Sequence, residues 1–166
     1  IENCLYGVDI QPIACQIAKL RFFIALIVDQ NMDRNEKNLG VRPLPNLETK
    51  IVAADTLIPA EKPTQYQSTL SDFRVRGLRE QLGWVRHDHF NARTPERKER
   101  CRARDAALRT EIAGVLEDSG WPSGASHALA AWDPYDQNHA AAFFDPEWMF
   151  GIPVGKVQEG QGSPST

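Results

Sequence analysis

Two short apolar segments, each with an aspartate at or near its end and separated by a long amphipathic stretch, most constrain the fold of this chain. The first covers residues 4–10 and carries Asp9, and the second covers residues 50–55 and ends at Asp55. Short apolar runs of this kind are typical of buried parallel strands. We therefore expect two strands in one sheet, with Asp9 and Asp55 at their carboxyl ends.

The stretch between these segments predicts a helix. Pro12 suits the first helical position, where a backbone N–H is not needed. Apolar side chains then recur at the helical spacing that makes one buried face: Ile13, Ile17, Leu20, Ile24 and Ile27. A polar run over residues 29–38 ends this helix. Strand, helix and strand form a βαβ unit, so the expected fold class is α/β with a partial Rossmann-like sheet.

A helical hairpin is expected after the second strand, as an insertion into the α/β fold. Its first helix covers residues 68–83, with one apolar side made of Leu70, Phe73, Leu78 and Leu82. A break is expected over residues 87–93. Thr94 and Pro95 are typical of the N-cap and first position of a second helix. This helix runs to about Ser119, where a Gly-Trp-Pro sequence ends it.

Four regions are thus expected along the chain. A βαβ region covers residues 1–66, and the inserted hairpin covers residues 67–122. Residues 123–152 form an aromatic-rich segment that we expect to pack as loops and short turns. Residues 153–166 are rich in Gly, Gln, Ser and Pro, a composition that predicts disorder.

Composition and charge place the chain among ordinary globular proteins. Of its 166 residues, 42% are hydrophobic and 25% are charged, and the net charge of −3 provides no overall basic field for nucleic acid. The longest apolar stretch, residues 22–28, is too short to span a bilayer, and no signal-peptide pattern is present. Cys4, Cys15 and Cys101 fit no zinc or redox spacing. We therefore expect a cytoplasmic protein with reduced, mostly buried thiols and no membrane contact.

Asp9 and Asp55 are candidate ligands of a nucleoside cofactor, because ligands of doubly wound sheets bind beyond the carboxyl ends of the strands. The carboxylate of Asp9 can accept hydrogen bonds from both ribose hydroxyls, and Ile10 can lie against the adenine. Asp55 can accept a hydrogen bond from the exocyclic amine of the same adenine, with Thr56 and Leu57 lining the pocket. The alternatives are a helix-start acid at Asp9 and a solvated loop acid at Asp55.

Three segments resemble, in the right order, motifs of large adenine-N6-specific DNA methyltransferases, namely the fused type IIG restriction–modification enzymes and the BREX-type phage-resistance methylases. Residues 5–21 resemble their second motif, and residues 44–58 are similar to their third motif and its lead-in. Residues 144–151, Phe-Asp-Pro-Glu-Trp-Met-Phe-Gly, resemble the stretch before their catalytic loop. The resemblance covers about residues 3 to 151 and makes the expected fold a partial Rossmann-like methyltransferase sheet with an inserted α-helical hairpin.

The resemblance implies S-adenosylmethionine as cofactor, double-stranded DNA as partner of the parent protein, and methyl transfer to N6 of a flipped adenine. Asp9 would hold the cofactor ribose and Ile10 would flank the adenine. Asp55 would bind the adenine amine, with Thr56 and Leu57 beside it. The parent would act in restriction–modification or phage defence.

The family pattern also places a glycine-rich motif before Ile1 and an Asn-Pro-Pro-Tyr loop after Gly151, and the chain contains neither. We therefore expect an internal fragment that contains no catalytic residues and does not transfer methyl groups by itself. Its partial sheet would have exposed edges.

Two other functions use the same features differently. A nicotinamide-dependent oxidoreductase also places an acid after its second strand for the ribose, but the long separation of Asp9 and Asp55 and the Asp-Ile-Gln-Pro-Ile-Ala pattern argue against it. A non-catalytic interaction module built on the helical hairpin would bind no ligand at all. Cofactor binding would separate this module from the methyltransferase.

Other conspicuous motifs have simpler structural interpretations. Residues 87–89, His-Asp-His, lack further ligands, so no metal site is expected. Residues 133–135 and 145–147, which both begin Asp-Pro, are interpreted as turns rather than catalytic loops. Five aromatic side chains are expected to close one end of the core: Trp132, Phe143, Phe144, Trp148 and Phe150.

Residues 93–109 carry seven basic and three acidic side chains. Such a helix could follow DNA phosphates, each contact adding salt-dependent affinity. The basic residues spread around the helix, however, so we interpret it as a solvated face with pairs such as Glu96 and Arg100.

Overall fold

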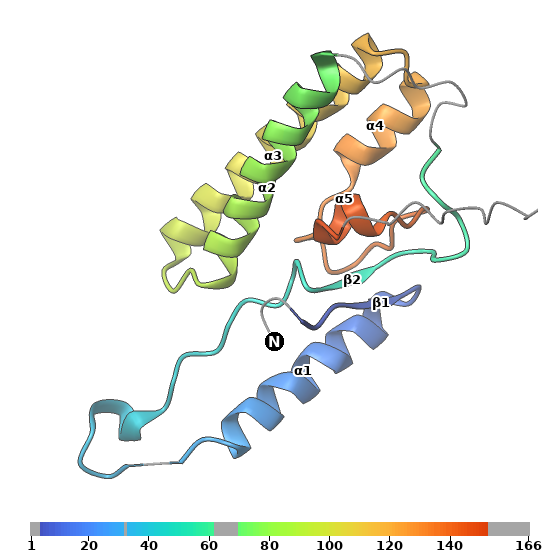
Figure 1. The fold of residues 1–166 in the computed structure, drawn as a ribbon. Helices are drawn as coiled ribbons and strands as arrows, with labels where there is room; N and C mark the ends of the chain where they lie inside the picture. Colours follow the sequence, from blue (N-terminus) through green and yellow to red (C-terminus); the bar gives the residue numbers. More distant parts are fainter. Residues whose placement is uncertain (1–3, 32, 62–69, 153–166) are drawn as a thin grey trace, which may run out of the picture.

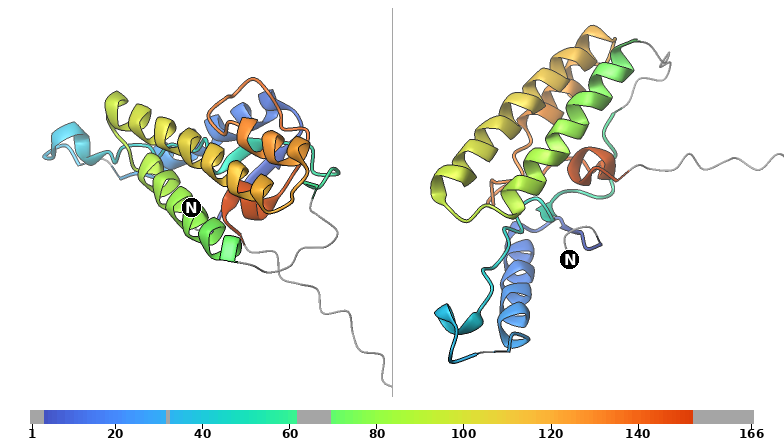
Figure 2. Two further views of the ribbon diagram at one scale, coloured as in Figure 1. Left: turned by 90° about the horizontal axis from the view of Figure 1, so that it is seen from above. Right: turned by 60° about the vertical axis from the view of Figure 1, so that its left-hand side comes forward.

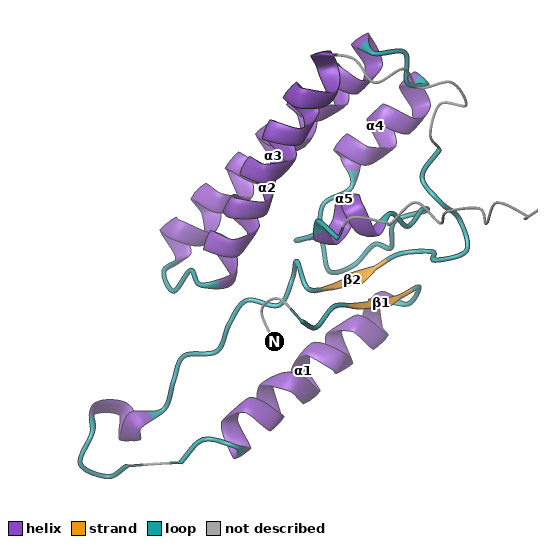
Figure 3. Ribbon diagram, viewed as in Figure 1, coloured by secondary structure: helices purple, strands orange, loops and turns teal. Residues whose placement is uncertain are grey.

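The computed structural model describes residues 4–31, 33–61 and 70–152. Figure 1 shows a small sheet in the middle of the molecule, with α1 on one side and the helices α2 to α5 on the other, and the right-hand view of Figure 2 shows the same arrangement after a turn about the vertical axis. Helices predominate over strands, as Figure 3 shows. The elements are β1 (Gly7–Asp9), α1 (Pro12–Val28), the 3₁₀ turn η1 (Lys37–Gly40), β2 (Ile51–Ala53), α2 (Leu70–Phe90), α3 (Pro95–Asp118), α4 (Ser123–Ala131) and α5 (Pro146–Phe150).

The sheet contains the two predicted strands, which run parallel. Val8 of β1 lies opposite Val52 of β2. Beyond β2, Ala54 pairs with Ala141 and Pro59 with Phe144, so a segment from far along the chain lies against the outer edge of β2. On the other edge, no strand of the described residues pairs with β1. The predicted mixed α/β architecture with a partial parallel sheet is therefore confirmed.

Helix α1 begins at Pro12 as predicted, but the prediction of its buried face is wrong. Its buried side contains Cys15 and Lys19 and packs on the sheet, where the Cys15 thiol donates a 3.1 Å hydrogen bond to the carbonyl of Val52. The expected face is 50–59% exposed at each position: Ile13, Ile17, Leu20, Ile24 and Ile27. The spacing of the apolar residues correctly indicates one apolar face of the helix. Among the described residues, however, no other element packs on that face.

The helical hairpin forms, with one boundary different from the prediction. Helix α2 continues through His87 to Phe90, where a break was expected, because the buried side chain of Asn46 binds the end of this helix. Helix α3 begins at Pro95, and the Thr94 hydroxyl accepts a hydrogen bond from the backbone N–H of Arg97, as predicted for an N-cap. On α2, Leu78 and Leu82 are buried as expected, whereas Phe73 is 71% exposed.

The aromatic-rich region contains two helices that the sequence did not predict. Helix α4 directly follows the end of α3, and α5 is a single short helix that precedes Gly151. Asp145 caps α5, because its carboxylate accepts a 2.8 Å hydrogen bond from the backbone N–H of Trp148. The predicted disordered tail, residues 153–166, lies outside the described residues.

The main core lies between the hairpin, α4, α5 and β2. Leu108, Ile112 and Leu116 of α3 are almost completely buried in it. The expected role of the aromatic cluster is confirmed, since Trp132, Phe143 and Trp148 are buried there and Phe144 and Phe150 pack against them. A smaller cluster on the α1 side contains Cys15, Leu47, Ile51 and Phe90.

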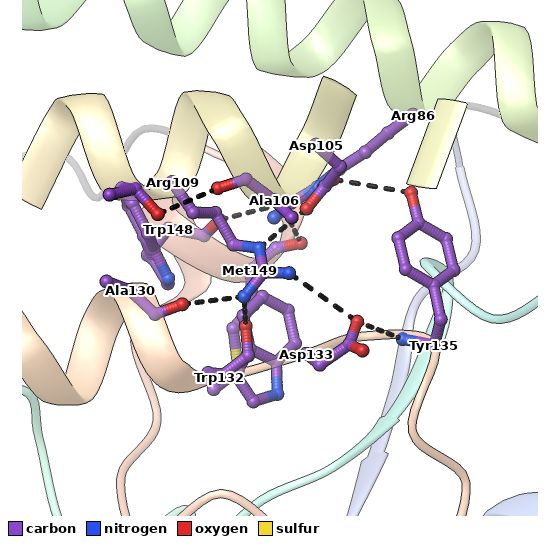
Figure 4. A network of polar contacts seen from close by, with 11 residues as sticks. Arg86, Asp105, Ala106, Arg109, Ala130, Trp132, Asp133, Tyr135, Trp148 and Met149 are labelled. Carbon is purple, nitrogen blue, oxygen red and sulfur yellow. Dashed lines mark hydrogen bonds and ion pairs between the residues drawn. The ribbon is translucent and has the colours of Figure 1, made fainter. Parts of the chain in front are cut away.

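A buried ionic network joins the helices (Figure 4). Asp105 of α3 is fully buried and accepts hydrogen bonds from Arg86 Nε at 2.9 Å and Arg109 Nε at 2.7 Å. The other nitrogens of the two guanidinium groups reach further along the chain. Arg86 Nη1 donates to the carbonyls of Trp148 and Met149 in α5, and Arg109 Nη1 donates to the carbonyls of residues 130 and 132. The network thus holds α2, α3, the end of α4 and α5 together.

The basic face of α3 was interpreted as solvated, and the structure corrects this in part. Arg97 pairs with Asp88 of α2, and Arg104 Nη2 donates a 3.1 Å hydrogen bond to Gln81 of α2. Nη2 of Arg102 lies 3.7 Å from Oε1 of Glu48, which belongs to the segment before β2. These arginines therefore bind neighbouring elements rather than their own helix. Among the described residues, no helix is both long and apolar enough to cross a membrane.

Candidate functional site

The carboxyl edge of the sheet carries both acids that the sequence singled out. Asp9 is the last residue of β1, and Asp55 comes two residues after the end of β2. The backbone N–H of Ala54 donates a 2.9 Å hydrogen bond to the carbonyl of Asp9, so the ladder continues to the residue before Asp55. The parallel topology therefore brings Asp9 and Asp55 to one edge.

In each acid, one carboxylate oxygen accepts a hydrogen bond from the backbone N–H two residues further along the chain. Oδ1 of Asp9 accepts from the backbone N–H of Gln11 at 2.8 Å, and Oδ1 of Asp55 accepts from the backbone N–H of Leu57 at 3.0 Å. Such turns hold the carboxylate beside its own backbone. The second oxygen of a carboxylate can then accept a hydrogen bond from a ligand.

The five predicted residues form an open surface. Asp9, Ile10, Thr56 and Leu57 are exposed and Asp55 is half-buried, with Ile10 at 56% and Leu57 at 89% exposure. An apolar side chain as exposed as Leu57 is available to contact a ring. The amino end of α1 follows directly after Asp9, an arrangement that agrees with both interpretations of that residue.

Near this sheet, Lys19 of α1 contacts Gln137, and this contact was not predicted from the sequence. Lys19 Nζ lies 2.9 Å from Oε1 of Gln137, and Gln16 Nε2 donates a 2.9 Å hydrogen bond to the backbone carbonyl of Gln137. Burial lowers the pKa of Lys19. A single polar residue in a loop has no periodic signal, so sequence alone could not have indicated that Gln137 contacts α1.

The His-Asp-His motif places its three side chains in different surroundings. His89 is fully buried and its ring lies 4.6 Å from the ring of Tyr135, whereas His87 is exposed. Asp88 pairs with Arg97, and this hydrogen bond lowers the pKa of Asp88. Burial lowers the pKa of His89. Within the described ranges, no group of three or more His, Cys, Asp or Glu could hold a metal ion.

The first Asp-Pro motif forms the turn expected of it, whereas the second begins a helix that was not expected. Oδ1 of Asp133 accepts a 3.0 Å hydrogen bond from the backbone N–H of Tyr135, which closes a turn. Asp145 is the N-cap of α5. Their carboxylates therefore stabilise local backbone structure.

Comparison with known proteins links this geometry to a family. Residues 3–100, more than half of the chain, match the Eco57I restriction-modification methylase family. The match contains β1, α1, β2 and α2, and with them both acids of the carboxyl edge. The chain belongs to this family. The prediction of a restriction–modification methylase is therefore confirmed at the level of the family.

One relative of this chain comes from Methanocaldococcus jannaschii. Over 58 residues the chain is 45% identical to this protein, whose assigned name is that of a type II restriction enzyme and methyltransferase. The aligned part makes up 35% of this chain and 5% of that relative, so the chain spans only a small part of the relative's length. No solved structure matches the methylase chain.

Proposed function

We propose that this chain is a segment of an S-adenosylmethionine-dependent DNA methyltransferase that acts on N6 of adenine in double-stranded DNA. The segment supplies the ribose and adenine half of the cofactor site at the carboxyl edge of β1 and β2. The observation that carries the proposal is the placement of Asp9 and Asp55 on this one edge, in a chain of the methylase family. The cofactor, when bound, would supply the methyl group.

Asp9 fits the role of ribose ligand. A carboxylate can accept from two neighbouring hydroxyls, and Asp9 is exposed at the end of its strand with one oxygen fixed by Gln11. Ile10 follows it and offers an exposed apolar side chain to one face of the adenine. The dipole of α1 would not oppose the approach of the ribose, which carries no charge.

Asp55 fits the role of adenine ligand. Its carboxylate is an acceptor, and the exocyclic amine of adenine is a donor. Its backbone N–H donates a 2.9 Å hydrogen bond to the carbonyl of Ala141, which anchors the residue between β2 and the neighbouring segment. Thr56 and Leu57 follow it and are exposed beside the same edge.

The remainder of the site would come from segments that pair with this one. A further strand could pair with β1 on the side away from β2. Gly7 and Asp9 direct their backbone N–H and C=O groups toward β2, whereas those of Val8 point to the unpaired side. The glycine-rich and Asn-Pro-Pro-Tyr motifs of the resemblance would be supplied in this way. The chain alone is therefore proposed to bind the cofactor weakly and to transfer no methyl group.

Calorimetry with S-adenosylmethionine tests this proposal, with NAD and buffer as comparisons. We expect S-adenosylmethionine to bind. NAD contains the same ribose hydroxyls and adenine amine, so its binding reports on the adenosine half-site alone. Asp9→Asn should weaken binding about tenfold, since the amide keeps an acceptor for Gln11 but loses one acceptor oxygen and the charge. Asp118→Asn, at the exposed end of α3, serves as the matched control. An affinity of Asp9→Asn equal to that of Asp118→Asn would contradict the proposal.

A further inference from the structure

A cavity lies at the amino ends of the strands, on the opposite side of the sheet from Asp9 and Asp55. Its volume is about 500 Å³, and its walls come from α2, from α5 and from the residues before each strand. Tyr6 precedes β1 and Lys50 precedes β2, so the cavity lies at the amino ends of the strands. It is therefore separate from the proposed cofactor site.

The cavity carries an excess of positive charge. Glu80 and Glu147 are the carboxylates in its wall, and Glu147 is already paired with Arg79 at 2.5 Å. Four cationic side chains line the same wall: Lys50, Arg76, Arg79 and Arg86. The charge of one of them, Arg86, is compensated by its ion pair with Asp105. Four cationic residues against two carboxylates in the cavity lining favour an anion.

Three buried donors in residues that line this cavity have no hydrogen-bond partner within the part of the chain that is described. They are Nε of Arg79, Nη2 of Arg86 and Nε1 of Trp148. Buried polar groups are usually paired. Guanidinium and indole nitrogens donate and do not accept, so a partner would need acceptor atoms. The cavity thus provides positive charge and hydrogen-bond donors together.

We propose that this cavity binds a phosphate group, carried either by a small anion or by the backbone of a nucleic acid. Phosphate oxygens match the fork of N–H donors on arginine and accept from several donors at once. Lys50 adds a point charge, and its Nζ is held 4.8 Å from the centre of the Tyr6 ring. A cavity of about 500 Å³ also leaves room for groups attached to the phosphate.

Titration of the whole chain with inorganic phosphate at constant ionic strength tests the proposal. The readout is the NMR signal of the Trp148 indole N–H, which Trp148→Phe identifies, because Trp148 lines the cavity and its Nε1 has no hydrogen-bond partner among the described residues. We expect a saturable shift. Lys50→Gln should weaken binding about threefold, and Glu80→Gln should tighten it by a similar factor, because the two changes alter the cavity charge in opposite directions.

Arg79→Gln should weaken phosphate binding more than Lys50→Gln does, since it removes a cation and releases the charge of Glu147. Arg100→Gln makes the same change of charge on the exposed side of α3 and should leave the affinity unchanged. A shift that does not saturate, or an equal loss of affinity in Arg100→Gln, would overturn the proposal.

A short DNA duplex distinguishes the two sources of the phosphate. A duplex that moves the same indole signal, and that phosphate displaces, identifies a nucleic-acid backbone. Phosphate binding with no response to the duplex identifies a small anion. Failure at this cavity leaves the cofactor proposal unaffected, because S-adenosylmethionine would bind at the opposite edge of the sheet.

Discussion

The backbone N–H of Ala54 donates a 2.9 Å hydrogen bond to the carbonyl oxygen of Asp9. This bond extends the pairing of β1 and β2 to the residue directly before Asp55. On its other side, the N–H of Asp55 donates to the carbonyl of Ala141 at 2.9 Å. Both acids are therefore held by backbone pairing, and their spacing depends on the sheet rather than on mobile side chains.

Removal of the buried charge at Asp105 should strongly destabilise the fold. Asp105→Asn is nearly isosteric but leaves the buried guanidinium groups of Arg86 and Arg109 without a counter-charge. We expect a loss of about 3 kcal/mol of unfolding free energy, measured by urea denaturation. Asp118→Asn should change it by less than about 0.5 kcal/mol. Equal urea midpoints for the two variants would show that the network contributes little.

Asn46 should be required for the end of α2. Its Nδ2 donates hydrogen bonds of 2.7 Å to the carbonyls of both His89 and Ala92. Asn46→Ala should cost about 2 kcal/mol, because the carbonyls of His89 and Ala92 each lose a buried hydrogen bond. Asn46→Asp should cost more at pH 7, since it places a carboxylate beside carbonyl oxygens. Asn138→Ala, at an exposed position, is the control, and an Asp variant as stable as the Ala variant would refute this role.

Burial of His89 predicts a pH dependence of stability. Burial lowers the pKa of His89 below its ordinary value of 6.5, so the folded chain holds this ring neutral where the unfolded chain protonates it. As pH falls below about 6.5, the unfolded state gains a proton first, and stability decreases until the lower folded pKa is reached. The contribution is at most about 1.4 kcal/mol per pH unit.

His89→Phe separates this contribution from other titrations, because it keeps an aromatic ring against Tyr135. Between pH 6.5 and 5, the unfolding free energy of this variant should fall less steeply than that of the natural chain. His127→Gln removes an exposed histidine and should keep the natural slope. Parallel curves for His89→Phe and the natural chain would exclude His89 as the source.

The exposed face of α1 should tolerate polar substitution. Ile17 and Ile24 are 52% and 53% exposed, so the double variant Ile17→Ser, Ile24→Ser should change the unfolding free energy by less than about 1 kcal/mol. Leu108→Ala, in the core, should cost about 2–5 kcal/mol. Sedimentation should show less self-association of the serine variant. A loss comparable to that of Leu108→Ala would mean that this face is covered in solution.

Features encoded by neighbouring residues could be predicted from the sequence. Pro12 and the apolar runs on either side of α1 indicated the βαβ unit, and Thr94 indicated the start of α3. The placement of Asp9 and Asp55 on one edge followed from the same topology, because the carboxyl ends of parallel strands lie together. These inferences needed only local spacing and the rule for parallel strands.

Features that depend on distant partners could not be predicted. Helix α2 extends to Phe90 because Asn46, more than forty residues earlier, binds its last carbonyls. Arg109 belongs to the run over residues 93–109 that was interpreted as solvated, yet it is buried in an ion pair with Asp105, which also binds Arg86 of α2. The cationic cavity combines residues before both strands with α2 and α5, so no single stretch of sequence carries its signal.

The most direct test of the cofactor assignment compares the affinity of this chain for S-adenosylhomocysteine with that for its deaminated analogue, S-inosylhomocysteine. The analogue has a carbonyl where adenine has its amine, so Asp55 can no longer accept a hydrogen bond there. We predict that the natural chain prefers the adenosyl ligand by about tenfold, and that Asp55→Ala loses this preference. Asp9→Asn should bind both ligands more weakly but keep the preference for the adenosyl ligand. A preference that survives in Asp55→Ala would contradict the assignment of Asp55 to the adenine.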